Sequence, residues 1–202
     1  TYRAQGDIKG GAALAAGNIV VGDYAGVVHA VDPATGAAAW TASVGQRFYG
    51  GPGVSGDTVV IGDVGGAVIA LAAGDGSVRW RHSPGGFVYA SPAIHDGRVF
   101  IGSYGGAFQA LDLASGAVVW SHEAGGRISG SATVVDGVVY TAILALPGQA
   151  RRTWGLDART GAVRYRGDDG RYTPAVAAGD TLYLVGTRML YAHPGTERRG
   201  TN

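Results

Sequence analysis

Short apolar runs alternate with glycine-containing turns along nearly the whole chain. Residues 90–123 show the pattern clearly, with runs of strand length in "ASPAIH", "RVFIGS", "GAFQALD" and "AVVWSHE" and turns at "DG", "YGG" and "LASG". An Asp-Gly pair between two apolar runs is a strong hairpin signal. The pattern therefore predicts four antiparallel strands within about forty residues.

This unit recurs along the sequence. The stretch "ALDLASGAVVW" (110–120) has near copies in "AVDPATGAAAW" (30–40), "ALAAGDGSVRW" (70–80) and "GLDARTGAVRY" (155–165). A repeated four-stranded unit of about forty residues is typical of a β-propeller blade. We therefore predict an all-β propeller in a single domain, residues 1–202, with complete blades over about 8–46, 47–86, 87–126 and 127–170.

A fifth blade begins at residues 171–194, which contain three strand-like runs and no fourth. Residues 1–6, "TYRAQG", look like the end of a motif strand. The simplest closure has residues 1–6 supply the missing outer strand of the last blade, which gives a ring of five blades without a long open edge. An open fragment of a larger ring is the alternative.

The repeated positions have structural roles. The motif aspartate is a natural acceptor for backbone N–H groups in the following turn, and the motif glycine suits a positive φ. The large aromatic residue that ends each motif is expected to dock against the adjacent blade. These docking residues are Trp40, Trp80, Trp120 and Tyr165.

Over residues 8–193 the motif resembles the repeat of pyrroloquinoline-quinone-like (quinoprotein) β-propellers, A-x-D-x-x-T-G-x-x-x-W. That family includes quinoprotein dehydrogenases, a barrel-assembly lipoprotein of the bacterial outer membrane, and sensor domains of bacterial serine/threonine kinases. The resemblance implies the propeller fold and an extracytoplasmic location, periplasmic or on the cell surface. A shared fold does not choose among these functions.

Composition excludes several partner classes. The formal net charge is +1, so no strong field favours nucleic acid, and no apolar run is long enough to span a membrane. The chain has no cysteine, which removes disulfides and thiolate chemistry. It opens with Thr1 and shows no signal segment, so we expect its targeting information to lie elsewhere.

A candidate ligand site lies where the segments between blades meet the central channel. At the same position in each repeat, just before the first strand of the blade, the sequence has aromatic and cationic residues. Together they could hold a flat, anionic or peptide-like ligand. The candidates are Lys9, Arg47, Tyr49, Tyr89, Arg127, Arg171 and Tyr172. The turns between second and third strands are expected to share this face, through Asp23, Tyr24, Asp63, Ser103 and Tyr104. The alternative is that the tyrosines plug the channel and the arginines are solvated.

A second candidate site is the insertion "AILALPGQARRTW" (142–154), which makes the last repeat step longer than the others. An exposed apolar run beside two arginines is a possible contact for another protein. Its residues are Leu144, Leu146, Arg151 and Arg152. The alternative is a tolerated surface insertion.

The sequence carries no recognisable catalytic or metal-binding pattern. The expected inner strands contain no Asp or Glu, which argues against glycoside hydrolysis. The five histidines show no ligand spacing, and no quinone-binding set is present, so we expect no cofactor, no metal and no enzyme activity. The sequence favours a non-catalytic ligand-binding or sensory propeller, similar to the kinase sensors. A protein-interaction scaffold resembling the barrel-assembly lipoprotein is the alternative, and a fragment of a quinoprotein dehydrogenase is the least favoured.

Overall fold

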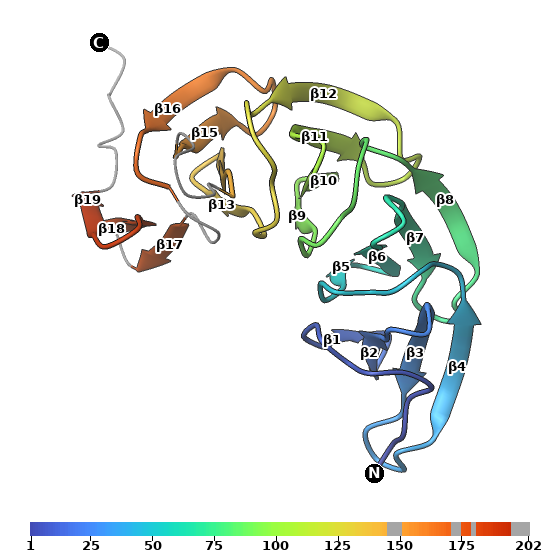
Figure 1. Cartoon of the computed structure of the whole chain (residues 1–202). Coiled ribbons are helices and arrows are strands. Elements are labelled where there is room, and N and C mark those ends of the chain that lie inside the picture. The colour runs from blue at the N-terminus through green and yellow to red at the C-terminus, as the bar shows by residue number, and fades with distance from the viewer. Residues whose placement is uncertain (145–150, 171–174, 179–180, 195–202) are drawn as a thin grey trace.

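The computed structural model describes residues 1–144, 151–170, 175–178 and 181–194. These residues form five antiparallel sheets that follow one another along an arc, with the first strand of each sheet toward the centre (Figure 1). We number the sheets blade 1 to blade 5 in chain order. No helix occurs among the described residues.

Blades 1 and 2 each have four strands, ordered from the centre of the arc outward. Blade 1 contains β1 (Ala13–Ala15), β2 (Asn18–Gly22), β3 (Val27–Val31) and β4 (Ala38–Ser43). Blade 2 contains β5 (Gly53–Ser55), β6 (Thr58–Gly62), β7 (Val68–Ala72) and β8 (Val78–His82).

Blades 3 and 4 repeat this order, and blade 5 has three described strands. Blade 3 contains β9 (Ala93–His95), β10 (Arg98–Gly102), β11 (Ala107–Asp112) and β12 (Val118–Glu123). Blade 4 contains β13 (Thr133–Val135), β14 (Val138–Ala142), β15 (Thr153–Asp157) and β16 (Val163–Gly167). Blade 5 contains β17 (Ala175–Ala178), β18 (Thr181–Val185) and β19 (Leu190–Pro194). The expectation of an all-β propeller of four-stranded blades is confirmed.

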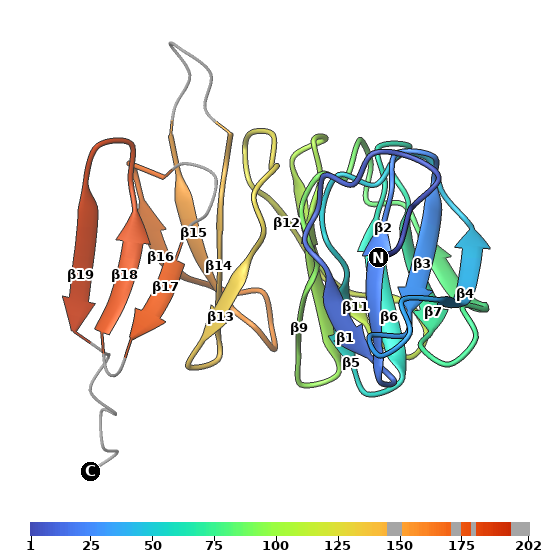
Figure 2. The same cartoon turned by 90° about the horizontal axis from the view of Figure 1, so that it is seen from below.

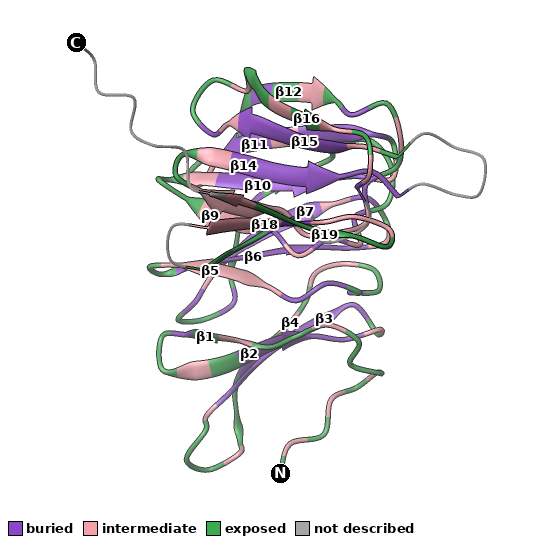
Figure 3. Ribbon diagram, turned by 90° about the vertical axis from the view of Figure 1, so that its left-hand side faces the viewer, coloured by how far each residue is buried: buried purple, intermediate pink, exposed green. Residues whose placement is uncertain are grey.

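The hydrophobic core lies between neighbouring blades (Figure 3). The second and third strands are buried on both faces, whereas the inner and outer strands are partly exposed. Between blades 1 and 2, for example, Val20 and Trp40 pack against Val59 and Leu71. Each blade therefore depends on its neighbour to cover its apolar face.

The docking tryptophans make the same contact at three successive interfaces. The Nε1–H of Trp40 donates to the Ala73 carbonyl at 2.9 Å, and that of Trp80 donates to Leu113 at 2.9 Å. Trp120 donates to Ala158 at 3.2 Å. The indole of one blade thus caps the last turn of the next and satisfies its own N–H.

The indole of each docking tryptophan packs directly on the glycine of the motif turn in the next blade. Gly76, Gly116 and Gly161 have φ values of 74°, 73° and 75°. A Cβ on any of them would lie 2.5–2.8 Å from an indole atom of the preceding blade. Any side chain at these positions would collide with the tryptophan and strain the backbone. On the neighbouring strand of the same blade, a small residue pairs with the tryptophan, as Ala110 of β11 does with Trp120 of β12.

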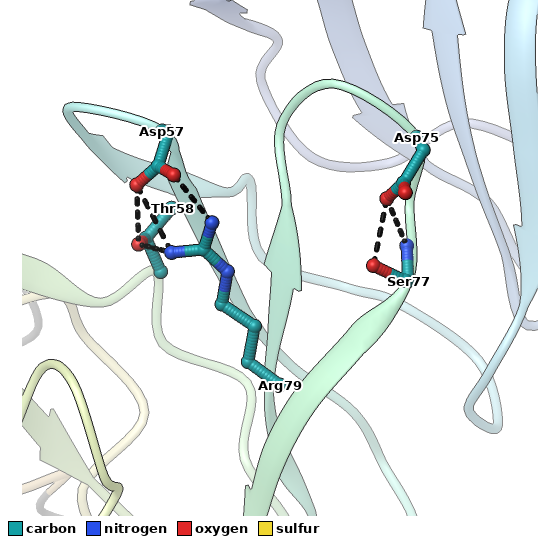
Figure 4. Close-up of polar contacts among 5 residues, drawn as sticks. All are labelled: Asp57, Thr58, Asp75, Ser77 and Arg79. Carbon is teal, nitrogen blue, oxygen red and sulfur yellow. Dashed lines mark hydrogen bonds and ion pairs between the residues drawn. The ribbon is translucent and has the colours of Figure 1, made fainter.

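The motif turns are held by aspartate, as the sequence predicts. Asp32 Oδ1 accepts from Ala34 N at 2.7 Å, and Asp112 Oδ1 accepts from Ser115 N at 2.8 Å. In blade 2 the motif aspartate is replaced by Ala72, and Asp75 holds the turn through the amide and hydroxyl of Ser77 (Figure 4).

The closure predicted from the sequence is not formed. Residues 1–7 lie against blade 1, where Gly6 N donates to Asp23 Oδ2 at 2.7 Å and Tyr24 N donates to the Asp7 carbonyl at 2.9 Å. Blades 1 and 5 stand at the two ends of an open arc, with the N-terminus beside blade 1 (Figures 1 and 2). The arrangement agrees with the open alternative for the described residues.

Candidate functional site: an aromatic belt on one face of the arc

The segments that connect the outer strand of one blade to the inner strand of the next, here called links, are fixed by a repeated hydrogen bond. Val64 N donates to the Arg47 carbonyl at 2.9 Å, and Tyr104 N donates to the Phe87 carbonyl at 2.8 Å. Each link therefore lies on the turn between the second and third strands of the next blade. This brings the link residues and those turn residues to one face, as the sequence predicts.

Buried polar side chains anchor these turns. Asp63 accepts from Ala67 N at 2.8 Å and from Gln46 N in the link at 2.8 Å. Ser103 takes the same place in blade 3 and donates to the Gly85 carbonyl at 2.7 Å. All of these side chains are buried, so Asp63 and Ser103 organise the backbone and do not present chemistry to a ligand.

Asp23 is the corresponding residue of blade 1, and its side chain is fully buried. Burial acts to raise the pKa of the Asp23 carboxyl, but hydrogen bonds from His29 and from the amides of Val27 and Gly6 outweigh it. Its pKa therefore lies below the usual range for aspartate. The Asp23 carboxylate therefore holds both the turn and the N-terminal segment.

Five aromatic rings form a continuous series on this face, which we call the aromatic belt. The ring of Tyr49 lies 6.3 Å from Tyr24 and 5.3 Å from Tyr89. Tyr89 continues to Tyr104 at 4.7 Å and to Phe87 at 6.1 Å. The belt therefore spans links and turns of the first three blades.

Two cations border the aromatic belt. The Lys9 ammonium lies 5.6 Å from the Tyr24 ring centre and 3.3 Å from the Asp7 carboxylate. The Arg127 guanidinium lies 5.6 Å from the Tyr104 ring centre. Both distances are within the range of a cation–π interaction.

A shallow groove of about 350 Å³ lies at one end of the belt. It is lined by Gly86, Phe87, Tyr104, Gly105 and Arg127. Its aromatic walls and one guanidinium can stack on a planar group and bind a carboxylate or phosphate. Tyr49 and Phe87 are about half exposed, at 48% and 51%, so apolar area remains available there.

The predicted channel-mouth residues divide into three groups. Lys9, Tyr49, Tyr89 and Arg127 belong to the belt or border it. The Arg47 side chain is exposed and makes no ring contact or ion pair within the described residues, while Arg171 and Tyr172 lie outside them. Tyr24 and Tyr104, which the sequence predicts on this face as turn residues, are also belt members, and Phe87 joins them.

The predicted partner loop differs from expectation at its start. Leu144 is buried, and its amide donates to the Arg127 carbonyl at 2.6 Å, so the exposed apolar run does not begin there. Arg152 packs 5.2 Å from the Trp154 ring centre and lies 3.9 Å from Asp168. Arg151 is exposed, and Leu146 lies outside the described residues.

The described part of the chain offers neither a cluster of metal-binding side chains nor a membrane-spanning helix. There, no group of three or more His, Asp or Glu side chains is arranged to hold a metal ion. Nor is there a helix with the length and hydropathy needed to cross a membrane.

The repeated blades, tryptophan docking and motif turns define a quinoprotein-like, PQQ-like β-propeller. A family model described as outer membrane protein assembly factor BamB matches residues 24–188, which is most of the chain. The protein belongs to this family. No curated protein sequence matches it significantly.

Solved structures support the fold. BamB from Moraxella catarrhalis is similar with a TM-score of 0.64 and 23% identity, covering 96% of this chain and 76% of that one. The quinohemoprotein alcohol dehydrogenase ADHIIG from Pseudomonas putida HK5 has a TM-score of 0.60 and 21% identity, covering 66% of this chain and 27% of that enzyme. The computationally designed Ika8 protein has a TM-score of 0.62 and 14% identity, covering 95% of this chain and 72% of that one. The chain thus spans about a quarter of the dehydrogenase that it resembles.

Proposed function

We propose that the protein is a non-catalytic scaffold of the cell envelope whose aromatic belt binds an extended segment of a partner protein. The observation that carries this proposal is the belt itself, with rings from Tyr24 to Tyr104 in continuous contact and cations at both ends. Tyrosine, phenylalanine and arginine are enriched at protein interfaces because they bury a large area with few rotatable bonds.

The chemistry of the belt indicates the kind of segment that would bind. A partner segment with apolar or aromatic residues can pack on the half-exposed rings of Tyr49 and Phe87. An acidic residue near Arg127 would form a charge-assisted hydrogen bond. We therefore expect an extended segment that combines aromatic and acidic side chains.

Family membership supports a binding role and an envelope location. The family is described as an outer membrane protein assembly factor, which is a role in assembly and not in the chemistry of a small substrate. An extracytoplasmic location of this chain is part of the proposal.

A second candidate is a sensor for a small planar anion, similar to the propeller sensors of bacterial serine/threonine kinases. The specific observation in its favour is the groove of about 350 Å³ between Phe87, Tyr104 and Arg127. A ligand of this kind would depend on the groove and not on Tyr49, which lies further along the belt.

A displayed library of random twelve-residue peptides tests the proposal. Selected peptides are expected to be enriched in aromatic and acidic residues, and their affinity should fall about tenfold or more in Tyr49→Ala and Arg127→Ala. Val163→Ala, which changes an exposed residue on β16, is the control. Binding that survives both belt changes would contradict the proposal, and dependence on Arg127 without Tyr49 would favour the groove.

A further inference from the structure

A cavity of about 250 Å³ opens between blades 3 and 4. It is bordered by the β9–β10 turn of blade 3 and by the β13–β14 and β15–β16 turns of blade 4. In antiparallel blades these turns lie at the opposite ends of the strands from the links and the belt turns, so the cavity opens on the other face of the arc. It is smaller than the about 300–1,000 Å³ typical of sites for drug-sized ligands, and it therefore suits a small molecule.

The cavity exists because one motif position is smaller in blade 4 than in blade 3. Leu113 follows the motif aspartate of blade 3 and packs into the core between blades 2 and 3. Blade 4 has Ala158 at the same position, in the core between blades 3 and 4. An alanine lacks the branched end of a leucine, so space remains beside Phe100, which lines the cavity with Ala158.

The cavity wall carries basic side chains that the preceding interface lacks. These residues are His95, Arg98 and Arg159. The corresponding residues between blades 2 and 3 are Ser55, Thr58 and Ala114. Because that interface forms without any of these charges, the basic residues between blades 3 and 4 are not needed to pack one blade on the next.

The two carboxylates that line the cavity each have a cation beside them. Asp157 accepts from Arg164 at 2.8 Å, and its other oxygen accepts from Thr160 N at 2.9 Å. Asp96 lies 3.3 Å from the His95 ring nitrogen. The charges of both carboxylates are therefore largely offset by groups other than the two arginines of the wall.

The two arginines of the wall remain available to a ligand. The Nε–H of Arg98 is buried and has no hydrogen-bond partner among the described residues. Asp112 lies opposite Arg98 on β11, but its Oδ1 accepts from Ser115 N at 2.8 Å. Arg159 stands on an exposed turn. A buried donor without a partner costs free energy, which a ligand oxygen would recover.

We infer that this cavity binds a small molecule through a carboxylate or phosphate group. Arg98 and Arg159 donate charge-assisted hydrogen bonds to the oxyanion, and Phe100 and Ala158 contact the apolar part of the molecule. The inference is independent of the proposed function, because the cavity and the aromatic belt lie on opposite faces of the arc.

Titration of the isotope-labelled protein followed by NMR tests the cavity with two probes, sodium benzoate and sodium phosphate. Ionic strength is kept constant with sodium chloride. The amide signals of residues 96–98 and 158–159 should shift and reach saturation with at least one probe, whereas chloride alone should not shift them. Saturation by benzoate would identify a carboxylate ligand, and saturation by phosphate alone a phosphate ligand.

Four variants locate the binding. Arg98→Gln and Arg159→Gln should each weaken the affinity about tenfold or more. Arg81→Gln removes the same charge from an exposed position on β8 and is the matched control. Ala158→Leu copies the residue of blade 3, so it should fold, fill the cavity and abolish saturation.

Three results would overturn the inference. The first is no saturation by either probe up to about 10 mM. The second is an affinity that Arg98→Gln and Arg159→Gln leave at the value of Arg81→Gln, which would mean that the oxyanion is not held by these guanidiniums. The third is full binding in Ala158→Leu, which would place the ligand outside the cavity.

Discussion

His29 Nε2 lies 3.0 Å from the Asp23 carboxylate, and both side chains are fully buried between the N-terminal segment and blade 1. The Tyr2 hydroxyl lies 2.7 Å from the other ring nitrogen of His29. An ionised Asp23 can only accept, so Nε2 is the donor in the bond between His29 and Asp23. The three side chains thus connect the N-terminal segment to the turn that begins the belt.

Another blade has different polar residues at these two positions, which suggests a double-mutant cycle. Blade 3 has Ser103 and Gln109 at the positions of Asp23 and His29. Asp23→Ser alone should lower the free energy of unfolding by about 3 kcal/mol, because it removes one partner of a buried pair. His29→Gln alone should cost about 1–2 kcal/mol.

The double variant carries the blade 3 pair and should lose less than the sum of the single changes, by about 1 kcal/mol. Urea denaturation of the four proteins measures this coupling. Strict additivity would show that Asp23 and His29 act independently, and would contradict the connection described above.

Glycine at the motif turn should be required wherever an indole lies on it. Gly116→Ala places a Cβ 2.6 Å from Trp80 Cδ2 at a positive φ, so we expect a loss of about 2–4 kcal/mol from collision and backbone strain. Gly74→Ala, where the added Cβ meets no atom within 4 Å, is the matched control and should change stability by less than about 0.5 kcal/mol. Thermal unfolding of the two variants distinguishes them, and equal losses would contradict the role of the glycine.

The fold was predictable because each repeat carries its own local signals. Turn residues, strand periodicity and one aromatic residue per blade together define a blade without any knowledge of its neighbours. The same repetition predicted which link and turn residues would share a face. The repetition did not predict the distances between the aromatic side chains of the belt, because these depend on how far each blade is rotated relative to the next.

The course of residues 1–6 was harder to predict from sequence. Their resemblance to the end of a motif strand was visible, but such a segment can pack on either end of the series of blades. The deciding contacts are tertiary, from Gly6 to Asp23 and from Tyr2 to His29. The burial of Leu144 was missed for a similar reason. Its amide pairs with the Arg127 carbonyl as Val64 and Tyr104 pair with the two preceding links, although the sequence around Leu144 is an insertion.

His122 should make stability depend on pH near neutrality. Its ring lies 4.6 Å from Trp154, and burial holds the pKa of His122 below its usual value of about 6.5. The unfolded chain therefore binds a proton more readily than the folded protein, so stability falls as pH is lowered from about 7.5 toward the folded-state pKa.

His122→Gln should flatten this part of the profile, while His95→Gln, on an exposed strand end, should leave it unchanged. Tm measured between pH 8 and 5.5 provides the test. A slope that persists unchanged in His122→Gln would contradict burial of the neutral ring as its cause.

Blade 5 should open more readily than blade 3. Blade 3 is covered on both faces, and its strands bury Phe100, Ile101 and Leu111 almost completely. In the described part of blade 5 only Ala175 and Leu184 are buried, while Val176 and Leu190 on its other face are more than half exposed. Local opening free energy follows the apolar area that an element buries, so amide hydrogens of β18 should exchange at least tenfold faster than those of β10.

Hydrogen exchange followed by mass spectrometry measures both strands in one experiment, and the buried pair Val99 and Leu111 in blade 3 serves as the internal reference. Equal protection of β18 and β10 would mean that the exposed face of blade 5 is covered in solution.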